Sequence, residues 1–273
     1  MSPGLRAFVA LTGEAFRDGL RRRFTFAVAL FLLAAGMGAE SCTDLGSASF
    51  SVNQRSIPPE VLAGLLAPLL MAWQALAVLV ITGVVAAGHL ARPLVEGSAA
   101  LWLARPISRE TFAAARLGGA LGVGLGAGAL LLGTSAGLVV ARQHLPVSPA
   151  LAAALATALG ALAVGSLAMA ASLVLGRSAV LVLVFGGVPC VALANTVTLV
   201  GQLVHPEAQL GGWLGAVDRY GPPLGTAIAA ALAPWNPHVD ATGTLGPALA
   251  RLGVWAAGGV LLLALAFRHT ELD

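Results

Sequence analysis

Six stretches of the chain are almost entirely apolar and are long enough, or nearly long enough, to cross a lipid bilayer. A helix needs roughly 20 apolar residues to span a hydrocarbon core about 30 Å thick. The six stretches are residues 23–39, 61–89, 112–140, 149–175, 179–203 and 247–267. This pattern predicts an all-α integral membrane protein, with six transmembrane helices in a single transmembrane domain over residues 1–273.

The first 22 residues have a different pattern, in which apolar and charged positions are segregated. At 100° per residue, Leu5, Phe8, Val9, Phe16 and Leu20 fall on one side of a helix, and the charged residues fall on the other. We expect residues 1–22 to form an amphipathic helix at the inner membrane interface, or a plain amphipathic extension with no special task. A secretory signal is disfavoured because the basic region before residue 24 is too long.

The stretch 204–246 is too long for a turn and too apolar for a free loop. Within it, residues 224–233 are apolar but too few to span a bilayer, which favours a re-entrant or interfacial helix. We therefore predict an outer re-entrant hairpin before the sixth span. Trp213, Tyr220 and Trp235 could anchor it at the lipid headgroups, or could simply belong to an aromatic belt.

Composition supports a lipid environment and excludes one kind of chemistry. The chain is 58% hydrophobic and 10% charged, whereas a soluble domain carries about 25% charge. All 15 basic residues are arginine. Without lysine, the chain can form neither a phosphate-binding GxxxxGK[ST] loop nor a Schiff base. We expect no cofactor, metal or nucleic acid on this chain.

The distribution of arginine predicts the orientation. Cytoplasmic loops keep an excess of positive charge, and with the amino terminus inside, only Arg55, Arg142, Arg219 and Arg251 fall on the outer side. We expect a multi-pass protein of the bacterial inner membrane with both termini in the cytoplasm.

Small residues indicate how the spans pack. Gly118, Gly122 and Gly126 form one row on the third span, and Gly124 and Gly128 form a second. Such rows allow close helix contact in lipid. This span should lie at the bundle centre or at a subunit seam, with the alanine-rich fourth span as its partner, and packing within one chain and dimerisation both stay open.

Polar residues inside the spans are few. No charged residue is expected deep in a span, which disfavours proton-driven antiport. Gln74, Asn195 and Thr198 are candidates for a substrate path, although hydrogen bonding within the bundle is the favoured role. Pro189 could kink the fifth span, and Cys190 is expected to be a small buried hydrophobe.

Sequence motifs for catalysis are weak. Residues 133–137 read GTSAG and match the GxSxG elbow of serine hydrolases, but that elbow needs a preceding strand, and here it falls within a span. The five histidines are scattered, without metal-ligand spacing. A membrane-embedded enzyme is therefore the weakest functional class.

The most informative segment is residues 90–111, between the second and third spans. Ser108 can cap a helix whose first turn carries Glu110, and a brief helix over 97–104 would present Trp102 before Pro106 ends it. An apolar, aromatic turn flanked by arginines is typical of a docking surface for a partner protein.

This segment resembles the membrane permeases of the ABC type-2 exporter class. The resemblance rests on a glutamate, a glycine and a hydroxyl residue, then a leucine-rich turn, then Arg-Pro-Ile-Ser-Arg and a basic residue that opens the next span. Here these positions are Glu96, Gly97, Ser98, Leu101, Leu103, Arg105, Pro106, Ile107, Ser108, Arg109 and Arg116. The family usually has a leucine and an acidic residue where Ala99 and Ala100 stand, and lysine in place of Arg116.

The resemblance implies a function and a set of partners. The segment would be a coupling helix that docks into a separate ATPase subunit, which would bind ATP and magnesium. The residues expected to carry this coupling are Glu96, Gly97, Leu101, Trp102, Arg105, Pro106, Ser108 and Arg109. Two copies of the permease, as a homodimer, would export an apolar or amphipathic substrate. The alternative is an ATP-independent carrier or channel.

Overall fold

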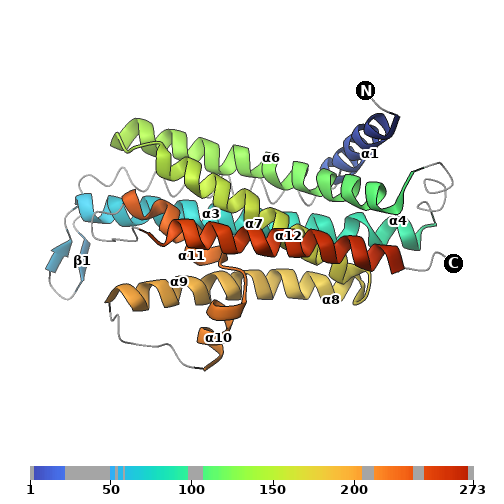
Figure 1. The fold of residues 1–273 in the computed structure, drawn as a ribbon. Coiled ribbons are helices and arrows are strands. Elements are labelled where there is room, and N and C mark those ends of the chain that lie inside the picture. The colour runs from blue at the N-terminus through green and yellow to red at the C-terminus, as the bar shows by residue number, and fades with distance from the viewer. Residues whose placement is uncertain are drawn as a thin grey trace.

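The computed structural model describes residues 3–21, 50–52, 55–57, 59–97, 107–204, 212–235 and 243–269. Its long helices form a bundle in which they run roughly parallel or antiparallel to one another (Figure 1). Five helical stretches are long and apolar enough to cross a membrane: Ala67–Val95, Arg109–Ala141, Ser148–Ser172, Gly176–Leu199 and Leu245–His269. The predicted helical membrane class is therefore confirmed in its coarse form. The predicted first span, residues 23–39, lies outside the described residues.

One small element was not expected from the sequence. Strands β1 (Phe50–Val52) and β2 (Arg55–Ile57) pair antiparallel, with Ser51 opposite Ser56. They precede α3 (Pro59–His89), which continues into the short α4 (Ala91–Val95). The chain is thus helical with one two-stranded hairpin among its described residues, and not purely α.

Helix α1 (Pro3–Leu20) exists as predicted, and the face by which it packs on the bundle overlaps the predicted apolar face only in part. Phe8 and Phe16 pack against the core and Leu11, Ala15 and Gly19 are buried, whereas Leu5, Val9 and Leu20 are about half exposed. The contact is with α6 (Arg109–Gln143), where Gly119 lies against the backbone of Ala15. Hydrophobic periodicity found the helix, but it could not show that glycines on α6 would accept its small residues.

Helix α7 (Ser148–Ser172) is central to the bundle. Its most extensive contacts are with α12 (Leu245–His269) and with α3, and those with α6 are smaller. The third and fourth spans are thus in contact as expected, but α7 turns its small residues mainly toward α12 and α3. Gly160, for example, lies under Leu79 of α3.

The fifth predicted span is a single helical path with a widened turn. It consists of α8 (Gly176–Val182), the π-helical turn η1 (Leu183–Gly187) and α9 (Val188–Val204). A π turn fits the expected irregularity at Pro189, since proline has no N–H for the helical ladder. Cys190 is exposed on this helix, so the expectation that it is buried was wrong.

The segment before α12 contains α10 (Gly212–Tyr220), α11 (Leu224–Leu232) and the 3-10 turn η2 (Ala233–Trp235). Helix α11 is mostly buried and packs against α7, α9 and α12. Leu224 reaches Gly160 near the midpoint of α7, and the Trp235 indole N–H donates to Pro146 O at 2.9 Å, beside the start of α7. The segment therefore extends from mid-bundle to one end.

The aromatic residues of this segment do not behave alike. Trp235 is buried, whereas Trp213 and Tyr220 are exposed. An anchoring role at the headgroups stays a prediction for Trp213 and Tyr220, and Trp235 is instead part of the packed core.

Two adjacent glycines on α12 give a direct test of this packing. A methyl group at Gly259 would overlap the Ser166 hydroxyl of α7, while one at Gly258 would meet nothing within 4 Å. We expect Gly259→Ala to destabilise the protein by about 1–3 kcal/mol through overpacking. Gly258→Ala should leave stability unchanged or slightly raised. Thermal unfolding in detergent measures both, and equal melting temperatures would contradict the α7–α12 interface.

Candidate functional site

The predicted coupling segment begins at an ordered helix end. Arg92 on α4 donates from Nε to Glu96 Oε1 at 2.6 Å, an exposed pair one helical turn apart. Gly97 follows with φ of 71°, in the left-handed region that glycine adopts without strain. Among the coupling residues, Leu101, Trp102, Arg105 and Pro106 lie outside the described residues.

The segment ends at a capped helix start. Ser108 has extended backbone angles, and its hydroxyl accepts a hydrogen bond from Thr111 N at 3.1 Å. Glu110 lies in the first turn of α6, where a negative charge suits the helix dipole. The predicted cap and first-turn acid are both confirmed, so α6 has a defined beginning immediately after the predicted segment.

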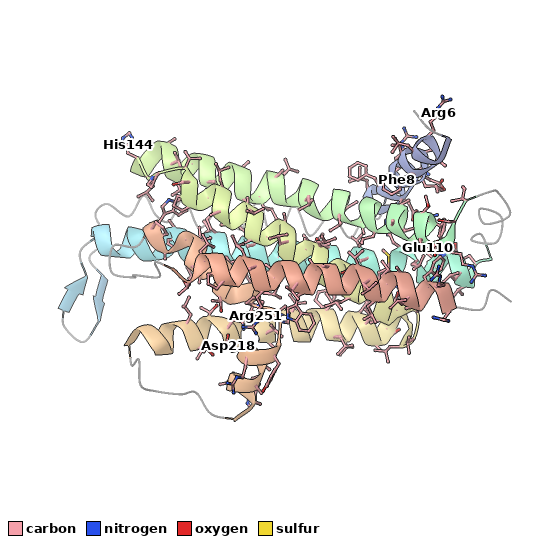
Figure 2. The ribbon with its side chains drawn as sticks, viewed as in Figure 1. Arg6, Phe8, Glu110, His144, Asp218 and Arg251 are labelled. Carbon is pink, nitrogen blue, oxygen red and sulfur yellow. The ribbon has the colours of Figure 1, made fainter. Side chains whose placement is uncertain are left out.

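The first turns of α6 are joined to the last turn of α12. The rings of Phe112 and Phe267 are both buried and stack with centroids 6.1 Å apart. Arg268 Nε lies 3.5 Å from Glu110 Oε1, and Arg109 Nη1 donates to Arg268 O at 3.4 Å. Figure 2 shows Glu110 at this junction. The ion pair is exposed and screened by solvent, so the aromatic pair is the main contact.

Two buried polar residues, one on α3 and one on α6, lie near α1 at the end of the bundle that carries α4. His89, at the end of α3, places Nε2 2.9 Å from Ala15 O of α1. Arg116 on α6 is 5% exposed, and its guanidinium carbon lies 5.2 Å above the Phe112 ring. The resemblance predicted Arg116 at the opening of the third span, and His89 was not singled out. Nothing in the sequence pattern showed that α1 would cover them.

The three candidate substrate-path residues lie in helix contacts. Gln74 Nε2 donates to Ser135 Oγ at 2.7 Å, joining α3 to α6. Asn195 donates to Asp218 Oδ1 at 2.9 Å and accepts from Gly225 N at 3.3 Å. Thr198 donates to Ala194 O within its own helix. These bonds agree with the favoured structural reading, and none of the three residues lines the two cavities described below.

Arg251 lies within α12, a helix long enough to span a membrane. Its Nη2 donates to Gly221 O at 2.7 Å and also to Asp218 O, which ties α12 to the α10–α11 turn. Figure 2 shows Arg251 and Asp218 side by side. Like Arg116, Arg251 lies about two turns from a helix start, so the expectation that no charge lies deep in a span stays a prediction.

The GxSxG match has no catalytic surroundings in the structure. Residues 133–137 lie inside the continuous helix α6, and the Ser135 hydroxyl accepts from Gln74. Across the described part of the chain, no group of three or more His, Cys, Asp or Glu residues could hold a metal ion.

An apolar cavity of about 540 Å³ opens between α6 and α7, next to α3. Leu125, Leu132, Val140 and Leu151 are among its lining residues, and Thr157 is a polar one. The exposed face of α6 beside it contains the small residues Gly126, Ala129, Gly133 and Gly137, together with the exposed Leu125 and Leu130. This surface could accept apolar groups or another helix.

A larger, charged cleft of about 740 Å³ lies at the other end of α6. It is bounded by α1, α4 and the first turns of α6, which meet at one end of the bundle in Figure 1. Arg116 is one of its lining residues. The bundle thus has an apolar cavity toward one end and a charged cleft at the end that carries the predicted coupling segment.

No model of a known protein family matches this chain, and no curated protein matches it. The function is therefore argued from the residues and contacts described above.

The cap at Ser108 provides a test of how firmly α6 begins. Ser108→Ala removes the acceptor for Thr111 N and should cost about 1 kcal/mol of local stability, whereas Ser108→Asp keeps an acceptor. Hydrogen exchange of the peptide covering residues 107–116 should accelerate in the alanine variant only. Equal acceleration in both variants would show that the cap does not hold this turn.

Proposed function

We propose that this chain is the membrane-spanning permease subunit of an ATP-binding cassette exporter and takes its energy from a separate ATPase subunit. The proposal rests on the resemblance of residues 96–109 to the coupling segment of ABC type-2 exporter permeases. The single observation that supports it best is the anchoring of this segment at both ends, by the Arg92–Glu96 turn and by the Ser108 cap.

The anchoring explains how movement of the segment would reach the bundle. A displacement of the segment would shift the first turn of α6, which carries Glu110 and Phe112. Phe112 is stacked on Phe267, so α12 would move with it. Packed contacts of this kind transmit displacement because a close-packed interior does not deform continuously.

The absence of lysine supports a transporter whose ATPase is a separate subunit. A chain without lysine has no phosphate-binding loop of the GxxxxGK[ST] type. ATP and magnesium would therefore be bound by the partner, and the present chain would contribute the path and the moving helices. This chain itself would perform no chemistry.

The apolar cavity supports the proposed substrate class. A space of about 540 Å³ lined mainly by leucine, valine, alanine and glycine suits an apolar or amphipathic molecule. A second copy of the chain would pack over the small-residue face of α6, where glycines permit close approach in lipid. The complex would then contain two permeases and two ATPases.

The proposed location is the inner membrane of a bacterial cell. The end of the bundle that carries α4, α1 and the end of α12 would face the cytoplasm, as the excess of arginine there favours. The ATPase would dock at this end, and the turn near Trp235 would face outward.

Co-purification tests this function directly. A tagged chain, gently solubilised, should retain an ATPase, and Trp102→Ala or Arg105→Ala should reduce the retained ATPase at least about tenfold if these residues are docking hot spots. Val174→Ala is the matched control, because Val174 is 79% exposed at the turn after α7, at the same end of the bundle. Retention of an ATPase by all three variants would remove the assigned docking surface, and no ATPase with the unaltered chain would favour a carrier or channel.

A further inference from the structure

The charged cleft between α1, α4 and α6 shares Arg92 and Glu96 with the proposed coupling segment, but its residues on α1 and Arg116 of α6 have no part in the proposed transport function. Four arginines line it, Arg17, Arg21, Arg92 and Arg116, together with the acidic residues Glu14, Asp18 and Glu96. Arg92 is paired with Glu96. The cleft of about 740 Å³ thus combines both signs of charge, with arginine in excess.

Arg116 distinguishes this cleft from an ordinary charged surface. Its side chain is 5% exposed, and its Nε has no hydrogen-bond partner among the described residues. The cation lies over the Phe112 ring, which stabilises its charge but cannot accept an N–H in the plane of the guanidinium. The carboxylates of Glu14 and Asp18 on α1 act on this cation electrostatically, but neither accepts a hydrogen bond from Nε. A buried donor without an acceptor is costly, so this N–H is available to a further anion.

The chemistry of guanidinium selects the anion. Its planar donors match the oxygens of a phosphate group, often through two parallel hydrogen bonds. Arg17 and Arg21, on the last turns of α1, lie across the cleft and supply further positive charge. The site is therefore suited to a phosphate that enters between α1 and α6.

The remaining lining and the position of α1 indicate where such a phosphate would come from. Val9, Ala10 and Pro93 give the cleft apolar surface, which a free inorganic ion would not need. Helix α1 also leaves Leu5, Val9 and Leu20 about half exposed, as expected for a helix in contact with a membrane surface. An amphiphile with a phosphate headgroup satisfies both parts of the lining.

We propose that this cleft binds the headgroup phosphate of a membrane phospholipid, with Arg116 as the buried ligand and Arg17 and Arg21 as supporting cations. The acyl chains leave past the exposed apolar residues of α1. The carboxylate of Glu14, which lies on α1 with Arg17 and Arg21, is placed to meet the ammonium of a phosphatidylethanolamine headgroup.

Native mass spectrometry of the purified full chain, with phosphatidylethanolamine or phosphatidylglycerol added, tests this site. Arg116→Gln should weaken phospholipid binding about tenfold, which corresponds to about 1.4 kcal/mol, the scale of one charge-assisted hydrogen bond. Arg17→Gln, a variant at an exposed position that should not impair folding, is expected to weaken binding in the same direction. Arg177→Gln is the control, because Arg177 is exposed and lies outside the cleft.

The outcomes separate the possible sources of phosphate. Weaker phospholipid binding in the Arg116 and Arg17 variants alone supports the site. Unchanged binding in Arg17→Gln and in folded Arg116→Gln overturns it, as does an equal loss in Arg177→Gln. Displacement of the phospholipid by millimolar inorganic phosphate overturns the lipid assignment.

Discussion

Close approach of helices through very small side chains is the constraint on which this structure depends. Lipid tails are as apolar as the helix surfaces, so no hydrophobic effect drives the helices together. Their association depends instead on close van der Waals contact. Thr82 of α3 illustrates the result, since its buried side chain fits between Gly124 of α6 and Gly165 of α7. Gly119 similarly admits α1. A bundle assembled this way has fixed interhelical spacings, and a helix that moves must carry its neighbours.

Polar and aromatic contacts join the helices at both ends of the bundle. At one end, His89 and the Phe112–Phe267 pair connect α1, α3, α6 and α12. Toward the other end, Asn195 and Arg251 hold the turn between α10 and α11. A buried polar group costs free energy unless it is hydrogen-bonded, so these contacts fix the register of the helices as well as their spacing. The proposed coupling segment enters this network at the first turn of α6.

Hydrophobic pattern and local chemistry were sufficient to predict much of this arrangement. The long helices, the cap at Ser108 and the short apolar helix α11 all follow from signals that lie within a few residues of one another. Long-range contacts were harder to predict. The face by which α1 packs depends on Gly118 and Gly119, about a hundred residues away, and the buried Arg116 faces a cleft that α1 helps to form.

In the candidate site, too, some features could be predicted from local sequence and others could not. The cap and the Arg92–Glu96 turn follow from local sequence, since their partners are one turn away. The junction with α12 does not, because Phe112 and Phe267 are separated by most of the chain. Glycine rows predicted close contacts but not their partners, and α7 accordingly packs mainly on α12 and α3.

The central claim is that the end of the bundle bearing α4 faces the cytoplasm, where an ATPase could reach it. In a chain lacking Cys42 and Cys190, single cysteines replace Val95, the last residue of α4, which is 88% exposed, or Val147, which is 52% exposed at the opposite end. A membrane-impermeant thiol reagent should label Val147→Cys in intact cells and Val95→Cys only after permeabilisation. Labelling of Val95→Cys in intact cells would contradict the account.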